Sequence, residues 1–133
     1  MTMIHLAGSV LLNEEKEILL LYRPSRDQWE LPGGKIEEGE EIIETVKREA
    51  REELLCDVSI IPNPLGDSEF QEDSRKMHYT WYQGNILGGK EPQIGEPETF
   101  SDLRYFSVAD MPSNLSPNMR NLHKRIVEGN IQL

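Results

Sequence analysis

The sequence predicts an α/β fold, with a β-sheet covered by helices on both faces. Two apolar runs open the chain, a helical repeat follows them, further extended segments come next, and a second helical repeat lies near the end. Strands and helices in this order indicate a sheet between helical layers. The length of 133 residues suits one domain with a substantial core, so we expect residues 1–133 to form a single domain.

The first strands are expected before the first helical repeat. Residues 3–12 and 18–22 are apolar runs separated by a polar turn, which predicts two antiparallel strands. Residues 29–31 form a short extended segment that ends at a Pro-Gly-Gly turn containing Gly33 and Gly34. Two adjacent glycines let the backbone approach a ligand closely, so this turn is a candidate part of a binding site.

A helical repeat begins near Glu40 and carries an apolar stripe that can pack on the sheet. The stripe consists of Ile43, Val46, Ala50 and Leu54. Glu49, Glu52 and Glu53 lie beside it, and their spacing of i, i+3 and i+4 places three carboxylates on one helical face. Like charges at this spacing destabilise a helix unless a cation neutralises them. A hard divalent cation such as Mg²⁺ takes oxygen ligands and would do so.

The second half of the chain supplies the remaining strands and the second helix. Extended segments are expected at residues 57–61, 65–70, 76–87 and 103–108. Residues 88–99 are rich in glycine and proline and predict a loop. Ser116 and Pro117 are typical of an N-cap and a first helical residue, so a helix is expected from there to near Gly129.

Residues 34–56 fit the Nudix box, G-x5-E-x7-R-E-U-x-E-E-x-G-U, in which U is a bulky apolar residue. Its fixed positions are occupied by Gly34, Glu40, Arg48, Glu49, Glu52 and Glu53. Ala50 and Cys56 occupy apolar positions, and Leu55 stands where the box has its second glycine. The chain therefore resembles the Nudix hydrolases, of the MutT-like kind. This resemblance implies an α/β/α sandwich with a mixed β-sheet between helices.

Leu55 is the one departure from the charged and glycine positions of the box. A glycine at the end of a helix commonly adopts the left-handed conformation. Because bulky residues rarely persist at positive φ, we expect Leu55 to leave the helix through a right-handed or 3₁₀ turn. The box carboxylates precede this turn, so their chemistry is not expected to change.

The resemblance implies a Mg²⁺-dependent pyrophosphohydrolase, with Mn²⁺ as a substitute, that acts on a nucleoside diphosphate linked to another group. A nucleoside triphosphate is the first expected substrate, and ADP-ribose or a nucleotide sugar is the alternative. A non-catalytic nucleotide-binding sensor of the same fold is a third interpretation. Such a sensor would be expected to lose a box carboxylate, and none is lost here.

The family resemblance also assigns the metal ligands. They are expected to be Gly33 through its carbonyl, Glu49, Glu52 and Glu53. Glu52 and Glu53 are also expected to be catalytic, since one carboxylate of the set accepts the proton of the attacking water. A solvated acidic face is the simpler interpretation of a glutamate-rich helix taken alone. The glycine turn, with Glu40 and Arg48 at the family spacing, favours the metal site.

Supporting roles follow from the same resemblance. Arg48 either holds a substrate phosphate or orients a neighbouring glutamate, and the family favours orientation. Gly34 and Glu40 are expected to support the site. A further catalytic carboxylate is expected from the loop at 88–99, where we name Glu98. Spacing does not separate it from the alternatives, Glu91 and Glu96.

Three residues before the box are candidates for substrate binding. Arg23 and Arg26 precede the glycine turn and could contact a phosphate or a nucleotide. Trp29 could stack on a nucleobase, although aromatic residues in strands more often belong to the core.

Composition limits the partners and the location. A net charge of −10 argues against polymeric nucleic acid, whose binding depends on phosphate neutralisation by Lys and Arg. It also requires a metal at any site that holds pyrophosphate. The apolar N-terminus lacks a basic segment, so export or membrane insertion is not expected. The single cysteine, Cys56, suits the reducing cytoplasm. A homodimer is left open.

The histidines do not indicate a metal site at this level. The chain has three, His5, His78 and His123, and they are widely separated. Zinc ligands usually come at close, regular spacings. Each histidine is therefore expected to be an ordinary surface or core residue.

Overall fold

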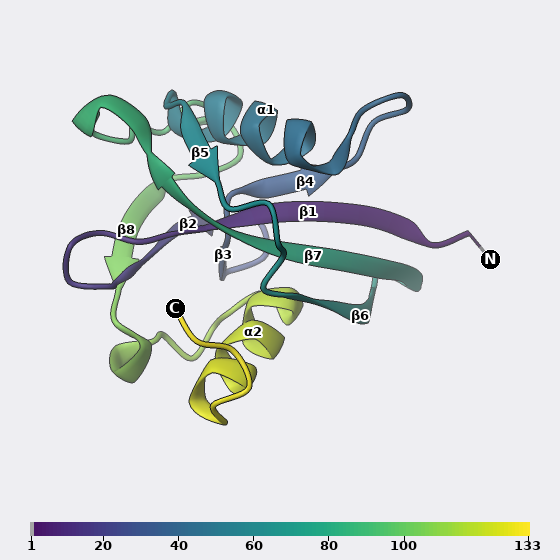
Figure 1. Cartoon of the computed structure of the whole chain (residues 1–133). Helices are drawn as coiled ribbons and strands as arrows, with labels where there is room; N and C mark the ends of the chain where they lie inside the picture. Colours follow the sequence, from purple (N-terminus) through teal and green to yellow (C-terminus); the bar gives the residue numbers. More distant parts are fainter. Residues whose placement is uncertain (1) are drawn as a thin grey trace.

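The computed structural model describes residues 2–133 and shows a curled, mixed β-sheet between two helices (Figure 1). Helix α1 (Ile42–Leu54) covers one face and helix α2 (Pro117–Val127) covers the other. The α/β/α sandwich predicted from the sequence is thus confirmed. Neither helix is long and apolar enough to cross a membrane.

Eight strands form two connected sheets. They are β1 (Ile4–Leu11), β2 (Ile18–Arg23), β3 (Gln28–Glu30), β4 (Gly33–Lys35), β5 (Val58–Ile60), β6 (Gly66–Glu72), β7 (Arg75–Ile86) and β8 (Asp102–Phe106). The larger sheet has the order β4-β1-β7-β5, with β6 also pairing with β7, and the smaller one has the order β3-β2-β8. The β1–β7 pair is parallel and the other pairs are antiparallel, which makes the sheet mixed.

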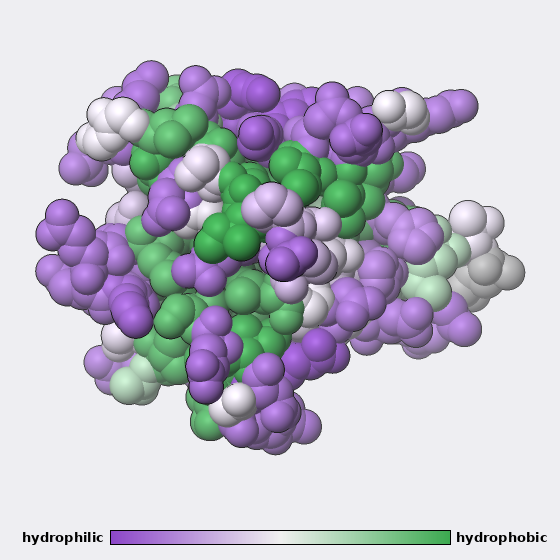
Figure 2. Space-filling view, in the orientation of Figure 1, coloured by the Kyte–Doolittle hydropathy of each residue, from purple (hydrophilic) through white to green (hydrophobic). Residues whose placement is uncertain are grey.

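The two helices bury different faces of the sheet. On α1, Ala50 and Leu54 are fully buried in a cluster with Leu19 of β2. On α2, Met119 and Leu122 pack in the cluster that contains the buried Trp81 of β7. Figure 2 shows hydrophilic side chains around the rim of one face and a band of apolar ones across its middle. The apolar stripe predicted for the first helix is therefore the surface that seats α1.

The predicted glycine turn is itself a strand. Gly33 and Gly34 pair antiparallel with Gly8 and Ala7 of β1, so the turn continues directly into the short strand β4. A Cβ at Gly33 would lie 2.5 Å from the Ala7 carbonyl oxygen, which explains why this position lacks a side chain. Pairing with β1 fixes the glycine backbone beneath α1, where the sequence predicted a turn that a ligand can approach closely.

The expectation for Leu55 was wrong. This residue follows α1 in the left-handed conformation, with φ 56° and ψ 36°, which is the geometry that the glycine of the box usually provides. Its N–H donates to the Arg51 carbonyl at 3.1 Å, and its side chain is 46% exposed. The chain therefore keeps the left-handed turn of the box. This conformation strains the backbone at Leu55, since a Cβ in this region costs about 1–2 kcal/mol.

Candidate active site

Arg48 forms the centre of the acidic cluster on α1. Its Nε and Nη2 donate to the two carboxylate oxygens of Glu40 at 2.7 and 3.1 Å. Its Nη1 donates to Glu49 at 3.0 Å and to Glu52 at 3.2 Å. Its Nη2 also donates to the Lys35 carbonyl at 3.2 Å. Of the two roles considered for Arg48, these contacts correspond to the orientation of neighbouring glutamates.

The negative charge of Glu40 is balanced by the groups around it. Hydrogen bonds from Arg48 and from the Thr45 hydroxyl lower the pKa of Glu40 to about 2. The Thr45 hydroxyl donates at 2.6 Å. Glu40 is therefore a fixed anion that holds Arg48, as its predicted supporting role requires.

Glu53 has the opposite environment. Its side chain comes from the inner side of α1, and the residue is only 4% exposed. Its Oε1 accepts the Gly33 N–H at 2.8 Å. Burial, followed by the charge of Glu49, raises the pKa of Glu53 well above its ordinary value, although the Gly33 N–H favours the charged form. A cation bound here would remove this penalty.

Glu49 lies directly against the backbone of β4. A Cβ added at Gly34 would lie 2.4 Å from the Glu49 Oε1, so the carboxylate occupies space that any side chain would take. Burial raises the pKa of Glu49 even though Arg48 opposes the shift. The box glycine therefore makes room for a box carboxylate, which is a physical reason for their occurrence in one motif.

The loop before β8 caps the C-terminal end of α1. The N–H groups of Gln93 and Gly95 donate to the carbonyls of Leu54 and Glu53, each at 2.9 Å. These bonds satisfy two carbonyls that a helix end leaves without an intrahelical partner. A Cβ at Gly95 would lie 2.1 Å from the Glu52 carbonyl oxygen, so this contact also needs a glycine.

This loop brings Glu96, rather than Glu98, to the acidic cluster. Glu96 contributes to the raised pKa values of both Glu49 and Glu53. Burial and the charge of Glu52 raise the pKa of Glu96 in turn. Glu98 and Glu91 are exposed, and neither contributes to the pKa values of the box glutamates. Of the three loop glutamates, Glu96 is thus the one whose charge acts on the box glutamates, which spacing could not distinguish, and the role of Glu98 stays a prediction.

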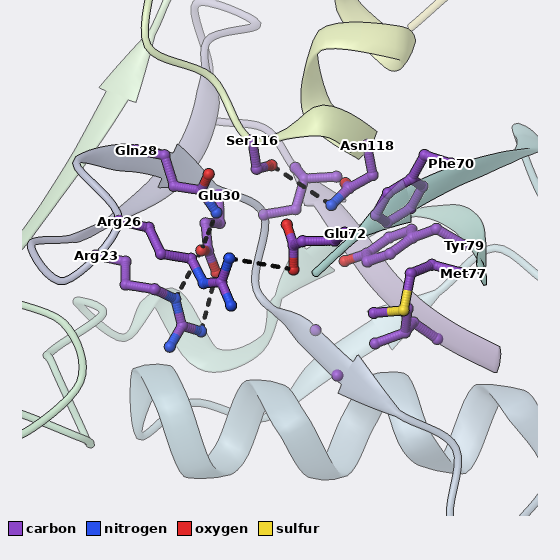
Figure 3. A pocket seen from close by; sticks show the side chains of 14 residues that line it. Arg23, Arg26, Gln28, Glu30, Phe70, Glu72, Met77, Tyr79, Ser116 and Asn118 are labelled. Atoms are coloured by element: carbon purple, nitrogen blue, oxygen red, sulfur yellow. Dashed lines mark hydrogen bonds and ion pairs between the residues drawn. The ribbon is translucent and has the colours of Figure 1, made fainter. Parts of the chain in front are cut away.

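A pocket of about 220 Å³ opens on the other side of Gly33 and Gly34, which form part of its wall. Figure 3 shows Arg23, Arg26 and Glu30 on one side of it, and the aromatic residues Phe70 and Tyr79 on the other. The Arg23 Nε donates to Glu30 at 2.7 Å, and the Arg26 guanidinium pairs with Glu72 at 3.8 Å. Arg23 and Arg26 thus line the pocket, as expected of substrate-binding residues.

Trp29 does not line this pocket. It is 8% exposed and packs in the core with Tyr22 and Phe106, at ring-centroid distances of 5.2 and 4.8 Å. The expectation of a stacking role for Trp29 is not supported, and the core interpretation fits. Its place at the pocket is taken by Phe70 and Tyr79, which come from β6 and β7.

Asn118 was missed by the sequence analysis. It is the second residue of α2, is buried, and contributes to the pocket wall. Its Nδ2 donates to the Ser116 Oγ at 3.4 Å, whereas its Oδ1 is buried without a hydrogen-bond partner. A buried acceptor without a partner is uncommon and costs about 1–3 kcal/mol. The only signal for Asn118 in the sequence is its place one residue after Pro117.

The carboxylates fit a hard cation that is held partly by other ligands. No group of three or more His, Cys, Asp or Glu side chains within residues 2–133 forms a preformed metal cage. Mg²⁺ commonly keeps several waters and binds through one or two carboxylates together with substrate phosphates. The raised pKa values of Glu49 and Glu53, caused mainly by burial, show that these oxygens would gain from a cation. The donor set therefore suits Mg²⁺ bound together with a phosphorylated ligand.

Comparisons with known proteins agree with this geometry. Residues 4–128 match the NUDIX domain family. The chain is 30% identical over 117 residues to a putative 8-oxo-dGTP diphosphatase of Bacillus subtilis, over 84% of this chain and 71% of that protein. It is 28% identical to an RNA pyrophosphohydrolase of Orientia tsutsugamushi, over 90% of this chain and 84% of that protein.

A solved structure shares this fold. The MutT NUDIX hydrolase of Burkholderia pseudomallei superposes with a TM-score of 0.82 at 24% identity, over 95% of this chain and 99% of that one. Nudix hydrolases generally use divalent metal ions, in keeping with the carboxylates of α1. The match over nearly the full chain, together with an intact set of box carboxylates, makes this protein a MutT-like member of the Nudix family, a hydrolase of pyrophosphate bonds.

Proposed function

We propose that this Nudix hydrolase is a Mg²⁺-dependent nucleotide pyrophosphohydrolase with a nucleoside triphosphate as its first expected substrate. The observation that carries the proposal is the position of Gly33 and Gly34. On one side they contact the carboxylates of Glu53 and Glu49, and on the other side they line the pocket. A nucleoside in the pocket would therefore direct its phosphates across the two glycines toward the box carboxylates.

Glu49, Glu52 and Glu53 would hold the cation, with the Gly33 carbonyl as a further ligand. Bound Mg²⁺, or Mn²⁺ in its place, would offset the charge of the pyrophosphate and acidify the attacking water. Arg48 would position the carboxylates, since it pairs with both Glu49 and Glu52. A net charge of −10 would otherwise repel the substrate.

A carboxylate near the attacked phosphorus would take up a proton. The water oxygen forms the new P–O bond, and the bridging P–O bond breaks with its electron pair going to the leaving phosphate. Burial raises the pKa of Glu53, which makes its ionised carboxylate a stronger base. Glu96 is the alternative base, because it adjoins the same cluster.

The pocket is small, and this supports a single nucleoside as the group that it recognises. Its volume of about 220 Å³ is below the roughly 300–1,000 Å³ of ordinary ligand pockets. The free Oδ1 of Asn118 could accept a hydrogen bond from a base N–H. The aromatic rings of Phe70 and Tyr79 offer apolar surface to the base. A damaged nucleotide such as 8-oxo-dGTP belongs among the first substrates to test, given the name of the Bacillus relative.

Composition supports a small substrate over RNA and a cytoplasmic location. The Orientia relative is named for RNA, but the acidic charge of this chain disfavours polymeric nucleic acid. Cys56 is a free, buried thiol, which suits a reducing compartment.

The proposal is tested with a panel of substrates in the presence of Mg²⁺. The panel contains 8-oxo-dGTP, the normal dNTPs, ADP-ribose, a nucleotide sugar and 5′-triphosphorylated RNA. We expect the highest kcat/KM for a nucleoside triphosphate, loss of turnover in excess EDTA, and recovery with Mg²⁺ or Mn²⁺. Preference for ADP-ribose or for the nucleotide sugar would select the alternative substrate class. Nucleotide binding without turnover of any compound would identify a sensor, and full turnover in EDTA would exclude the metal.

A further inference from the structure

A second cluster of polar side chains lies outside the box, where β1 and β7 begin. His5 and His78 are direct partners in the parallel pairing of these strands, so their side chains emerge on the same face of the sheet. Their Nδ1 atoms are 3.3 Å apart although 73 positions separate the residues in the sequence. The histidines that looked scattered in the sequence are therefore brought together by one strand pairing.

A contact with Asp67 of β6 determines which nitrogen of the neutral His78 ring carries the proton. Its Nε2 lies 2.7 Å from the Oδ2 of Asp67. A carboxylate only accepts hydrogen bonds, so this Nε2 carries a proton and the Nδ1 of the neutral ring carries a lone pair. That lone pair faces the Nδ1 of His5. His5 is exposed, so its own tautomer is free to adjust.

The geometry of this pair matches two ligands of one metal ion. The two rings lie edge to face, with centroids 5.3 Å apart and planes at 71°, so they do not stack. Zinc binds imidazole nitrogen at about 2.0–2.1 Å in a tetrahedral arrangement, which places two ligand nitrogens about 3.3–3.4 Å apart. Metal-binding histidines almost always donate their other ring N–H to a carboxylate or a carbonyl. The contact between His78 and Asp67 has this form.

We propose that His5 and His78 form a binding site for a divalent transition-metal cation such as Zn²⁺, with Asp67 as the positioning residue for His78. Imidazole nitrogens favour zinc, copper and nickel, whereas magnesium prefers oxygen. The site therefore differs in chemistry from the carboxylates of α1 and does not depend on the function proposed for them.

The remaining coordination positions are open to solvent. Glu69 is the direct partner of His78 in the β6–β7 pairing, is exposed, and lies on the same face as Asp67. Its carboxylate can therefore rotate toward the two nitrogens. Since no third ligand is already in place within residues 2–133, water completes the site and the affinity is modest. A cation here joins β1 to β7 and stabilises the folded state by mass action.

The test is a Zn²⁺ titration at saturating Mg²⁺, followed by thermal unfolding and calorimetry. We expect a saturable rise in the melting temperature of the wild-type protein. His5→Ala and His78→Ala should each weaken Zn²⁺ binding by at least about tenfold, because one of two protein ligands is lost. Asp67→Asn should weaken it by about 10–100-fold, as loss of a group that orients a ligand usually does. His123→Gln is the matched control and should bind like the wild type.

His5 is exposed, so His5→Ala tests the site even if replacement of His78 disturbs the fold. A second readout follows the ring protons by NMR at constant pH. Signals of His5 and His78 should change together on addition of Zn²⁺, and those of His123 should not. A Zn²⁺ response that is absent in the wild type, or is the same in His5→Ala, overturns the proposal.

Discussion

Two carboxylates of the same motif, Glu40 and Glu53, have opposite environments. Glu40 accepts from Arg48 and Thr45, and these hydrogen bonds lower its pKa to about 2. Glu53 is buried, receives the Gly33 N–H, and has a pKa raised by burial and by neighbouring carboxylates. Arg48 thus supplies the positive charge beside Glu40, whereas beside Glu53 a bound cation would have to supply it.

Within one motif, this difference separates a carboxylate that positions other side chains from one that can take part in catalysis. A carboxylate that is neutralised by the protein fixes other side chains and gains little from a metal. A desolvated carboxylate without a cation destabilises the fold, and strongly perturbed carboxylates of this kind cluster at functional sites. The outer edge of the cluster, at Glu40, therefore holds Arg48 in place, and the inner edge, at Glu49 and Glu53, is where a cation would bind.

The largest effect is expected from removal of charge at the glutamates that are expected to hold the metal. Glu53→Gln or Glu52→Gln should lower kcat by about 100-fold or more, because a metal ligand or a general base is lost. Glu40→Gln should cost less, about tenfold, since it acts only through Arg48. Glu38→Gln, at an exposed glutamate just before the box helix, is the control and should retain full activity. Similar small losses for all four variants would indicate a solvated acidic face.

The next effect tests the contact between the box glycine and the inner edge. Gly34→Ala would place a Cβ 2.4 Å from the Glu49 Oε1, so the carboxylate must move. We expect a fall in kcat of about tenfold or more, since a misplacement of about 1 Å can have large effects on catalysis. The Mg²⁺ concentration needed for half-maximal activity should rise as well. Gly39→Ala has open space around its Cβ but lies at φ 80°, so it adds backbone strain without a contact to Glu49. Its stability should fall while its kinetics stay near those of the wild type, and equal kinetic losses for the two variants would contradict the argument.

The pH dependence of the free energy of unfolding distinguishes the outer edge from the inner edge, and it requires no activity assay. Because folding raises the pKa of Glu53, its neutral form is favoured in the native state. In metal-free protein this contribution is fully present below the ordinary carboxyl pKa of about 4.3 and is lost as the pH rises through the native pKa. Glu53→Gln should therefore stabilise the metal-free protein at pH 8, by about 1–3 kcal/mol, and much less at pH 4.

Glu40 should show the reverse sign, since its pKa is lowered to about 2. Its contribution is present above the ordinary carboxyl pKa and is lost as the pH falls toward the native value. Glu40→Gln should thus destabilise the protein at pH 7, progressively less as the pH falls below the ordinary carboxyl pKa, and little only below about pH 2, as measured by urea unfolding. The same pH profile for both variants would mean that the two carboxylates do not differ in environment.

The smallest effect concerns Leu55, which lies beyond the inner edge. Leu55→Gly should raise the free energy of unfolding by about 0.5–1 kcal/mol. Glycine removes the strain of the left-handed conformation, and this gain exceeds the stability that is lost because glycine makes the unfolded chain more flexible. Leu55→Ala keeps the strain and should give no gain. A melting temperature that falls in Leu55→Gly would show that the packing of the leucine side chain outweighs the strain.

Local patterns predicted the elements and the box because these depend on neighbours in the chain. The stripe on α1 and the cap formed by Ser116 and Pro117 are of this kind. The position of Glu96 could not be predicted, since it depends on how the loop at 88–99 docks on the end of α1. The pocket residues Phe70, Tyr79 and Asn118 likewise come from three separate elements.

Leu55 shows a limit of another kind. Its left-handed conformation, with φ 56°, is unfavourable for leucine, so intrinsic preference predicted the wrong turn. The motif, which places a glycine there, would have predicted the right one. Where a motif and a residue preference disagree, the backbone here follows the motif.

The parallel pairing of β1 with β7 has a consequence for how the chain folds as it is synthesised. Ile4 pairs with Met77, and Leu11 pairs with Gly84, so the first strand reaches its central neighbour only after most of the chain has been made. At about 5–20 residues per second, β1 waits for several seconds with an apolar edge unpaired. The antiparallel pairing with β4 can form earlier and cover one side of it. A nascent chain that stalls before β7 is therefore the species of this protein most exposed to aggregation.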